Sequence, residues 1–173
     1  TTKYLVHGEI AITPEKYFIH GGGKMKAVTP DIFNINKYKS DEQQTNKRIE
    51  NLVKQIEEQR ENARRGKPLT KPLGPLQEKL AEENKHLVEV KMKIRACKPW
   101  ERDSEFSDAL ILAGDMLFAG GNNSVSASNV KTGVEVWRHA VRGRALGLAV
   151  ANGRLLVSTD EGEIHCFQTK GAQ

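Results

Sequence analysis

The feature that most constrains the fold is a pattern of strand, turn and strand that occurs twice near the C-terminus. Residues 110–121 and 148–159 align with their turn residues, Gly114 and Asn152, 38 positions apart. A related pattern covers residues 10–21, 100 positions upstream of the first copy. With one repeat length removed, about 62 positions remain, close to the length of the charged stretch 41–100. Because a period near ~40 with several short strands is typical of propeller blades, the sequence predicts a β-repeat array with an insertion.

Turn residues divide the array into short predicted strands. Glycine and Asn-Gly turns favour hairpins, since they adopt positive φ at low cost. The predicted strands cover residues 4–12, 17–19, 25–28, 32–35, 109–112, 124–130, 134–137, 145–151, 155–158 and 164–167. The predicted turns cover residues 13–15, 20–23, 120–123, 131–133, 152–153, 160–162 and 169–171. The chain stops where another strand is expected, so we predict about two and a half to three incomplete blades.

The inserted segment has the pattern of two helices. Ser40 and Gln43 fit a capping box, in which each side chain bonds a backbone N–H left free by the first turn. An apolar stripe follows, and Gly66 is the predicted end of a helix of about 24 residues. Pro75 suits the first turn of a second helix that runs to about Ala96. The fold class is therefore mainly β with an α insertion, an antiparallel helical hairpin of coiled-coil character. The predicted domains are residues 1–39 and 100–173 for the blades and 40–99 for the hairpin.

The charge pattern argues against several classes of protein. The net charge is +5, and residues 41–100 contribute +4 of it through 14 Lys and Arg against 10 Asp and Glu. Nucleic-acid binding through Arg64, Arg65, Lys67 or the basic residues of the second helix is disfavoured, because acids alternate with the bases. Those second-helix candidates are Lys91, Lys93, Arg95 and Lys98. No apolar run reaches 18 residues, which predicts no membrane span. Thr1 is not a natural start, which predicts a processed product or a fragment.

Residues with chemical potential are scattered along the chain. Cys97 and Cys166 lack metal-ligand spacing and are expected to be buried free thiols, with a disulfide as the alternative in an exported protein. Strand alternation places His165 and Cys166 on opposite faces, which argues against a catalytic pair. The remaining residues are expected to have no catalytic, cofactor or metal role. They are the histidines His7, His20, His86 and His139, the serines Ser124, Ser126 and Ser128 of a hydrated strand face, the turn glycines Gly21, Gly22 and Gly23, and the acids Asp115, Asp160, Glu161 and Glu163.

The segment 129–137, with Lys131, Thr132, Gly133 and Trp137, resembles the end of a repeat of the pyrroloquinoline-quinone-like (PQQ-like, quinoprotein-like) propeller family. The resemblance extends over about 70 residues from Ser107 onward, and it is weaker over the first 38, where no tryptophan closes the unit. It implies that Trp100 and Trp137 pack between blades. Quinone-binding members have adjacent cysteines, which are absent from this sequence, so no cofactor is expected.

The resemblance implies a binding or scaffold segment of a bacterial propeller, located in the periplasm or otherwise exported. Its expected partners are other chains or the remainder of a longer polypeptide that complete the ring, with the helical hairpin as the docking element for protein–protein interaction. One alternative is an accessory part of a larger enzyme, such as a methyltransferase or a quinoprotein dehydrogenase. A second alternative is nucleic-acid binding through the basic hairpin. For this chain alone, the residues favour a protein that is not an enzyme.

Overall fold

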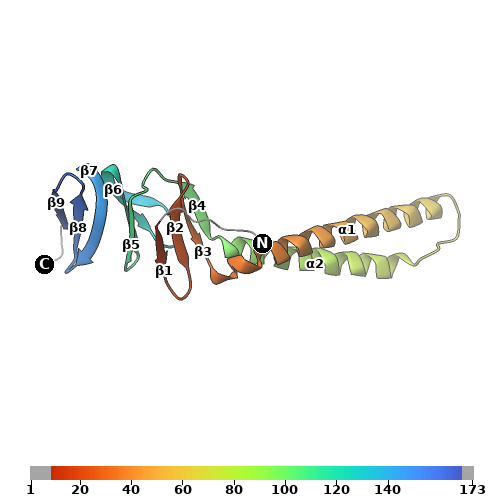
Figure 1. Cartoon of the computed structure of the whole chain (residues 1–173). Helices are drawn as coiled ribbons and strands as arrows, with labels where there is room; N and C mark the ends of the chain where they lie inside the picture. Colours follow the sequence, from red (N-terminus) through yellow and green to blue (C-terminus); the bar gives the residue numbers. More distant parts are fainter. Residues whose placement is uncertain (1–8, 169–173) are drawn as a thin grey trace. The chain divides into compact units, whose positions relative to one another are not determined.

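The computed structural model describes residues 9–168, which form two antiparallel sheets and an antiparallel pair of helices (Figure 1). The first sheet contains β1 (Ile10–Ile12), β2 (Tyr17–Gly21), β3 (Lys24–Val28) and β4 (Trp100–Asp103). The second contains β5 (Ala109–Ala113), β6 (Met116–Asn129), β7 (Glu135–Ala151), β8 (Arg154–Thr159) and β9 (Ile164–Gln168). Between β3 and β4 lie a 3₁₀ helix, η1 (Pro30–Asn34), and the helices α1 (Ile35–Arg64) and α2 (Leu73–Cys97). These elements confirm the predicted fold class.

The chain divides into two compact units. The β unit consists of Thr1–Pro30 and Lys98–Gln173, and the helical unit of Asp31–Cys97. Three sequence-based expectations lie outside the described residues: the beginning of the first strand at residues 4–8, the final turn at 169–171, and the role of His7.

In the first sheet, neighbouring strands pair in the order β1-β2-β3-β4. Gly22 and Gly23 form the turn between β2 and β3 with φ of 61° and 74°, as predicted. The predicted fourth strand at residues 32–35 is wrong, because this segment forms η1 and the start of α1. The helical unit instead enters before the fourth strand, and Trp100 of β4 pairs with Ala27. A tryptophan therefore does close the first sheet, although the sequence places it some 70 residues downstream of β3.

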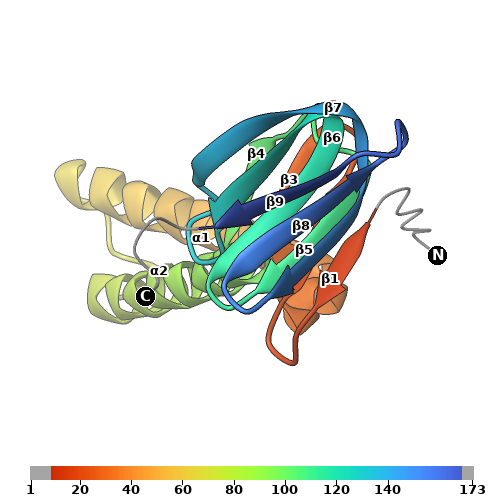
Figure 2. The same ribbon diagram turned by 90° about the vertical axis from the view of Figure 1, so that its left-hand side faces the viewer.

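The second sheet is folded into two layers by its two long strands. The first half of β7 pairs with β6, and its second half pairs with β8 (residues 145–151 against 154–159). We call β5, β6 and the first half of β7 the middle layer, and residues 145–168 the outer layer. The outer layer lies over the middle layer (Figure 2). The predicted turn at residues 120–123 is wrong: β6 runs through it with a register shift at Asn123, whose φ is 54°.

Two apolar clusters hold these layers together. The first lies between the sheets and includes Phe18, Met25, Phe106 and Leu117, each no more than 1% exposed. The second lies between the middle and outer layers, with Val125 and Val157 fully buried at its centre. Strand alternation explains both clusters, since every second residue of a strand points to the same face. The two clusters therefore form the interior contacts between the first sheet and the middle layer and between the middle and outer layers.

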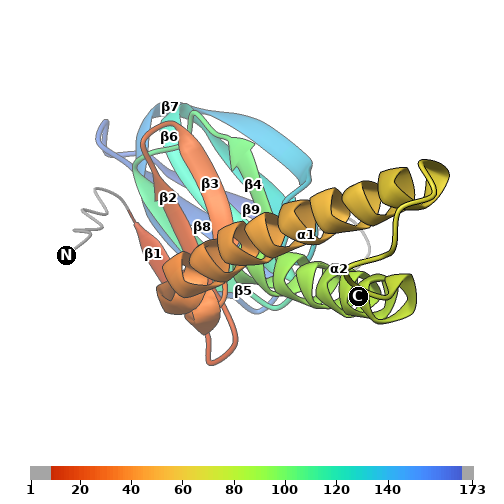
Figure 3. The same ribbon diagram turned by 90° about the vertical axis from the view of Figure 1, so that its right-hand side faces the viewer.

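In the helical unit, α1 and α2 lie side by side (Figure 3), and their buried residues form a seam with heptad spacing. Gln59, which is 3% exposed, accepts the backbone N–H of Thr70 at 2.9 Å and donates to its hydroxyl at 2.8 Å, so it holds the connecting loop. Arg48 pairs with Glu83 at 2.9 Å across the helices. The buried or half-buried seam residues are Tyr38, Glu42, Thr45, Ile49, Leu52, Ile56 and Gln59 of α1 and Leu73, Leu76, Leu80, Glu83, Leu87, Val90, Ile94 and Cys97 of α2.

The predicted helix start at Ser40 is wrong, because α1 begins at Ile35 and has 30 residues rather than about 24. Ser40 accepts a side-chain hydrogen bond from Gln44 at 3.4 Å within the helix instead of capping its end. Residues 35–39 contain no helix breaker, and η1 leads directly into them. The predicted end is confirmed: Gly66 follows the helix with φ of 68°.

Replacing residues 31–97 by a short glycine-containing linker should leave the β unit folded. We expect this because β3 and β4 are adjacent antiparallel strands, which a short turn can connect. The measurement is circular dichroism with thermal unfolding, and the isolated peptide 31–97 serves as the comparison for helix content. Loss of the strand signal in the shortened protein would contradict the interpretation of the helical unit as an insertion.

Candidate functional site

An aromatic groove lies at one end of the space between the middle and outer layers of the β unit. Its volume is about 770 Å³. Trp137 of β7 and Phe167 of β9 form its centre, with ring centroids 5.1 Å apart in an edge-to-face arrangement. The ring centroids of His139 and Phe167 are 4.8 Å apart. Met116 and Phe118 of β6 contribute apolar side chains to the groove. Half-buried aromatic rings of this kind are well suited to bind a further apolar chain segment.

The strand β9 borders the groove and is one edge of the second sheet. Its inner face carries His165 and Phe167, which are half-buried, and its outer face carries Ile164 and Cys166, which are exposed. The side of β9 away from β8 has no partner strand within residues 9–168. The backbone groups on that side are therefore available to pair with another strand.

A tryptophan also lies between the first sheet and the middle layer, where neighbouring residues cover it. The indole Nε1 of Trp100 donates to the carbonyl of Val130 at 2.9 Å, and its ring lies against Gly133 in the turn before β7. Trp100 thus connects the first sheet to the middle layer. Trp137 occupies the corresponding place in the middle layer, 37 positions later, and faces the groove. Both tryptophans have the packing role expected from the sequence.

Charged side chains form a network along the loops of the β unit. Arg138 binds Glu135 at 2.7 Å and also contacts Glu105. Hydrogen bonding from Arg138 lowers the pKa of Glu135 below its ordinary value. Arg144 binds Asp108, whose side chain is 5% exposed, at 2.6 Å and lowers its pKa in the same way. These ion pairs tie the loop 104–108 to β7 and leave no basic cluster for an anionic ligand here.

A buried serine–histidine pair joins β2 to the residue that follows β4. His20 of β2 lies with Nε2 3.1 Å from Ser104 Oγ, the distance of a nucleophile and its base. However, His20 is 1% exposed and Ser104 is 9% exposed, so a substrate has no access. The other ring nitrogen, Nδ1, has no hydrogen-bond partner, whereas a catalytic base is oriented by a third group. The geometry therefore indicates a structural pair.

The burial of His20 gives a testable dependence of stability on pH. Burial, and then the nearby Arg102, lower the pKa of His20, while Asp108 acts in the opposite direction. The unfolded chain therefore takes up a proton below about pH 6.5 that the folded chain resists. We expect the free energy of unfolding to fall between pH 6.5 and 5, by up to about 1.4 kcal/mol per pH unit. Chemical unfolding at several pH values should show this slope reduced in His20→Gln and retained in His139→Gln, whose imidazole is exposed.

The remaining sequence candidates do not come together into one site. His86 binds Asp41 at 3.1 Å between the helices, and His165 contacts Glu163 at 3.2 Å. Cys97 is buried and donates to the carbonyl of Asp31, while Cys166 is exposed, so only one of the two thiols fits the expectation of burial. Both cysteines are free. The alternation of His165 and Cys166 onto opposite faces is confirmed.

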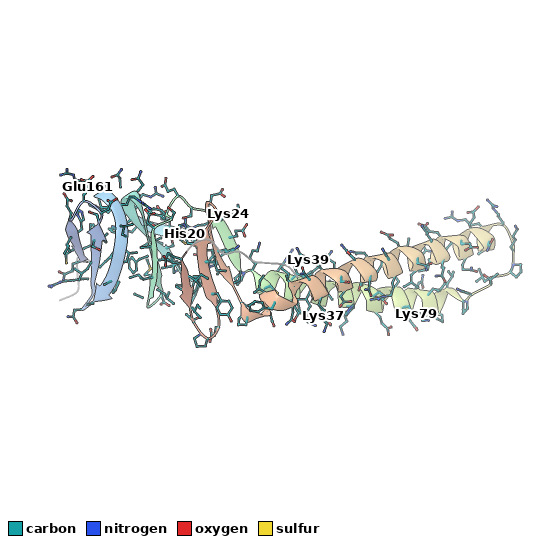
Figure 4. The ribbon with its side chains drawn as sticks, viewed as in Figure 1. His20, Lys24, Lys37, Lys39, Lys79 and Glu161 are labelled. Atoms are coloured by element: carbon teal, nitrogen blue, oxygen red, sulfur yellow. The ribbon has the colours of Figure 1, made fainter. Side chains whose placement is uncertain are left out.

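Two further expectations concern the serines and the acids. The hydrated strand face predicted for Ser124, Ser126 and Ser128 is wrong, because Ser126 and Ser128 are fully buried. Ser128 accepts a hydrogen bond from Arg102 at 2.8 Å, which satisfies it in the interior. Asp160 accepts the backbone N–H of Arg144 at 2.7 Å, and Glu161, at the turn before β9, binds Arg142 at 2.7 Å (Figure 4). No group of three or more possible metal ligands occurs in the described part of the chain.

The basic residues of the helical unit are dispersed. Arg65 binds Glu61 at 2.8 Å, and Lys71 donates to Gln55 at 2.7 Å, so acids and amides neighbour the bases. Lys37, Lys39 and Lys79 are exposed on different parts of the two helices (Figure 4). Of the helices within residues 9–168, none has the length and hydropathy needed to cross a membrane.

Sequence reasoning missed the aromatic groove and the role of β9. The groove joins Met116 and Phe118 to Trp137 and Phe167, which strand periodicity alone cannot bring together. A signal for the edge was nevertheless present, since the segment 164–168 contains no charged residue and no proline. The alternation of polar and apolar residues likewise did not indicate that His20 and Ser126 face the interior.

Comparison with known proteins shows only distant similarity. No protein-family model matches the sequence, and no curated protein matches it. The crystal structure of the computationally designed Ika4 protein aligns over 43% of this chain and 49% of that chain, with 11% identity and a TM-score of 0.37. The crystal structure of BamB from Moraxella catarrhalis aligns over 43% of this chain and 24% of that chain, with 24% identity and a TM-score of 0.37. The chain therefore spans about half of the first protein and about a quarter of the second.

Proposed function

We propose that this chain is a non-catalytic binding and scaffold segment of a PQQ-like propeller. Further strand structure, from the remainder of a longer polypeptide or from a partner chain, adds to the edge of β9 and fills the aromatic groove. The observation that carries the proposal is the edge of β9, which has no partner strand within residues 9–168, beside a groove lined by Trp137 and Phe167. An edge of this kind offers main-chain hydrogen bonds for affinity and pockets for side chains for specificity.

The helical hairpin is the proposed second docking element, and a helix is its proposed partner. Val88 and Met92 lie one turn apart on α2, away from the seam, with 58% and 65% of their surfaces exposed. Apolar residues at this spacing provide a narrow stripe on which another amphipathic helix can pack. The mixed charges around the stripe favour this occupant over a polyanion.

The proposal is tested by photocrosslinking in the native source. Benzoylphenylalanine is introduced at Ile164 on the edge and, in separate variants, at Met92 and at the control position Val134, which is exposed in the turn before β7. We expect Ile164 to crosslink to an extended segment and Met92 to a helical one, both identified by mass spectrometry. Yields at Ile164 no higher than at Val134 would contradict strand addition.

The proposed location is the periplasm or another exported compartment. Cell fractionation of the native source followed by mass spectrometry of peptides from residues 9–168 tests it. Recovery of these peptides only with cytoplasmic marker proteins would overturn this part of the proposal and leave the binding role intact.

A further inference from the structure

The four terminal strands of the two sheets, β1, β4, β5 and β9, differ in how they are protected. The edge strand β4 carries Glu101, Arg102 and Asp103, and β1 has only three residues and is followed closely by Pro14. Charges, short length and proline are devices that discourage pairing with another chain. The edge strand β5 is uncharged, but each of its residues is buried or half-buried. Of these four terminal strands, β9 alone is longer than three residues, uncharged and exposed along one face.

We propose that β9 is a self-association edge, which pairs antiparallel with β9 of a second copy about a two-fold axis through Cys166. The inference rests on the proposed function of β9 as an acceptor of strands and names the occupant. In this register Cys166 faces its own equivalent, His165 faces Phe167 of the second copy, and Ile164 faces Gln168 of the second copy. Such an interface is isologous, since each copy contributes the same surface.

When a strand pairs with its own copy, the residue on the two-fold axis lies opposite an identical residue. Cys166 is compatible with this arrangement. A charged central residue would lie directly opposite an identical charge, which destabilises an antiparallel pair. Cys166 is small and uncharged, and its neighbours His165 and Phe167 form favourable aromatic cross-strand pairs in the proposed register. Opposed residues in an antiparallel pair have Cα atoms about 4.5 to 5.5 Å apart, within the range that a disulfide can bridge.

The charges beside β9 do not place like charges opposite each other under two-fold rotation. Glu163 precedes β9, and Arg154 lies beside its other end, where it is paired in register with Gln168. Arg154 is exposed and has no ion pair in the described part of the chain. Rotation places the acidic end of one copy at the same end of the pair as Arg154 of the second copy, with one β9 strand between them. The β unit as a whole is nearly neutral, with 12 Lys and Arg against 11 Asp and Glu, so net charge does not oppose the approach.

The outer face of the last layer gains a continuous apolar strip in the pair. Leu156 of β8 is in register with Cys166 and is 38% exposed, and Ile164 on the same face is 76% exposed. In a single copy these residues form a small patch. In the pair, Leu156 and Cys166 of one copy lie in one row with Cys166 and Leu156 of the second copy, and this row crosses all four strands. The contact surface remains small, so we expect a reversible dimer rather than a permanent one.

The first test is sedimentation equilibrium of the full chain under reducing conditions. We expect a concentration-dependent mass that approaches about 38.6 kDa, twice the 19.3 kDa of one chain. Ile164→Lys should weaken the dimer at least about tenfold, because it places a charge on the edge. Val134→Lys, an equivalent change at an exposed position away from the edge, should leave the dissociation constant unchanged. A monomer at all concentrations, or equal effects of the two lysines, would overturn the inference.

The second test is oxidation of the full chain with diamide, which takes up two hydrogens as two thiols form a disulfide. We expect a Cys166–Cys166 crosslink in the wild type and in Cys97→Ser, and none in Cys166→Ser. Moving the thiol to the exposed control position, as Val134→Cys in the Cys166→Ser background, should reduce the crosslinking rate at least about tenfold, since random collision replaces pairing. Equal rates at the two positions would overturn the inference.

The two proposals fail in different ways. If the chain is monomeric while benzoylphenylalanine at Ile164 crosslinks to another polypeptide, strand addition at β9 stands and self-pairing is wrong. If both experiments detect no contact at Ile164, strand addition itself is wrong. A crosslink from Ile164 to the region of Gln168 in a second copy supports both.

Discussion

We expect Gly133→Val to lower the free energy of unfolding of the β unit by about 3 kcal/mol, through positive-φ strain and overpacking against a fixed ring. Gly133 has φ of 72°, and a Cβ built on it would lie 2.5 Å from the Trp100 ring. The indole cannot move away easily, because its Nε1 is bonded to Val130 and its ring packs against Phe18. The measurement is urea unfolding followed by tryptophan fluorescence.

Gly153→Val is the matched control for this substitution. Gly153 has nearly the same backbone conformation, with φ of 71°, but a Cβ there would have no atom within 4 Å. We therefore expect only the cost of the positive φ, about 1 to 2 kcal/mol. Equal losses in the two variants would show that the Trp100 contact contributes nothing beyond backbone strain.

Phe106→Ala should destabilise the β unit by about 4 kcal/mol, because truncation of a buried phenylalanine leaves a cavity. Phe106 is 0% exposed although it lies in the connection between β4 and β5. It packs in the cluster between the two sheets, and the guanidinium of Arg138 lies 4.8 Å from its ring centroid. The truncation should also expose this cluster to solvent, which is measured by urea unfolding and by binding of a hydrophobic dye.

The control for this second prediction is Phe33→Ala in the helical unit. Phe33 is 75% exposed, so its truncation removes little buried surface and should change the free energy of unfolding by less than about 0.5 kcal/mol. Similar losses for both phenylalanines would mean that Phe106 does not hold the sheets together.

Trp100, Gly133 and Phe106 affect the proposed function because they support the layer that carries the groove. Trp100 and Gly133 connect the first sheet to the middle layer, and Phe106 packs in the same cluster between them. The middle layer in turn carries Trp137, the centre of the proposed acceptor surface. Destabilising variants should therefore also weaken strand addition at β9, and they should be examined only under conditions where the β unit remains folded.

Much of the local structure was predictable because it depends on short stretches of chain. Positive-φ glycines and Asn-Gly determine tight turns, so Gly22 and Asn152 marked real hairpins. Heptad spacing and a terminal glycine determined the two helices and the end at Gly66. The errors at Ser40 and at residues 120–123 arose where two local readings were both possible. A serine fits a helix interior as well as a cap, and two glycines fit a bulged strand as well as a turn.

The sequence by itself therefore determined most of the strands and turns, the two helices and the alternation of His165 and Cys166. Only the tertiary structure decided which strands are neighbours. It paired β4 with β3 across the 71 residues of positions 29–99, buried His20 and Ser126, and formed the groove beside Trp137 and Phe167. The physical reason is range: turn and helix propensities act over a few residues, whereas burial and edge exposure depend on the packing of layers distant in sequence.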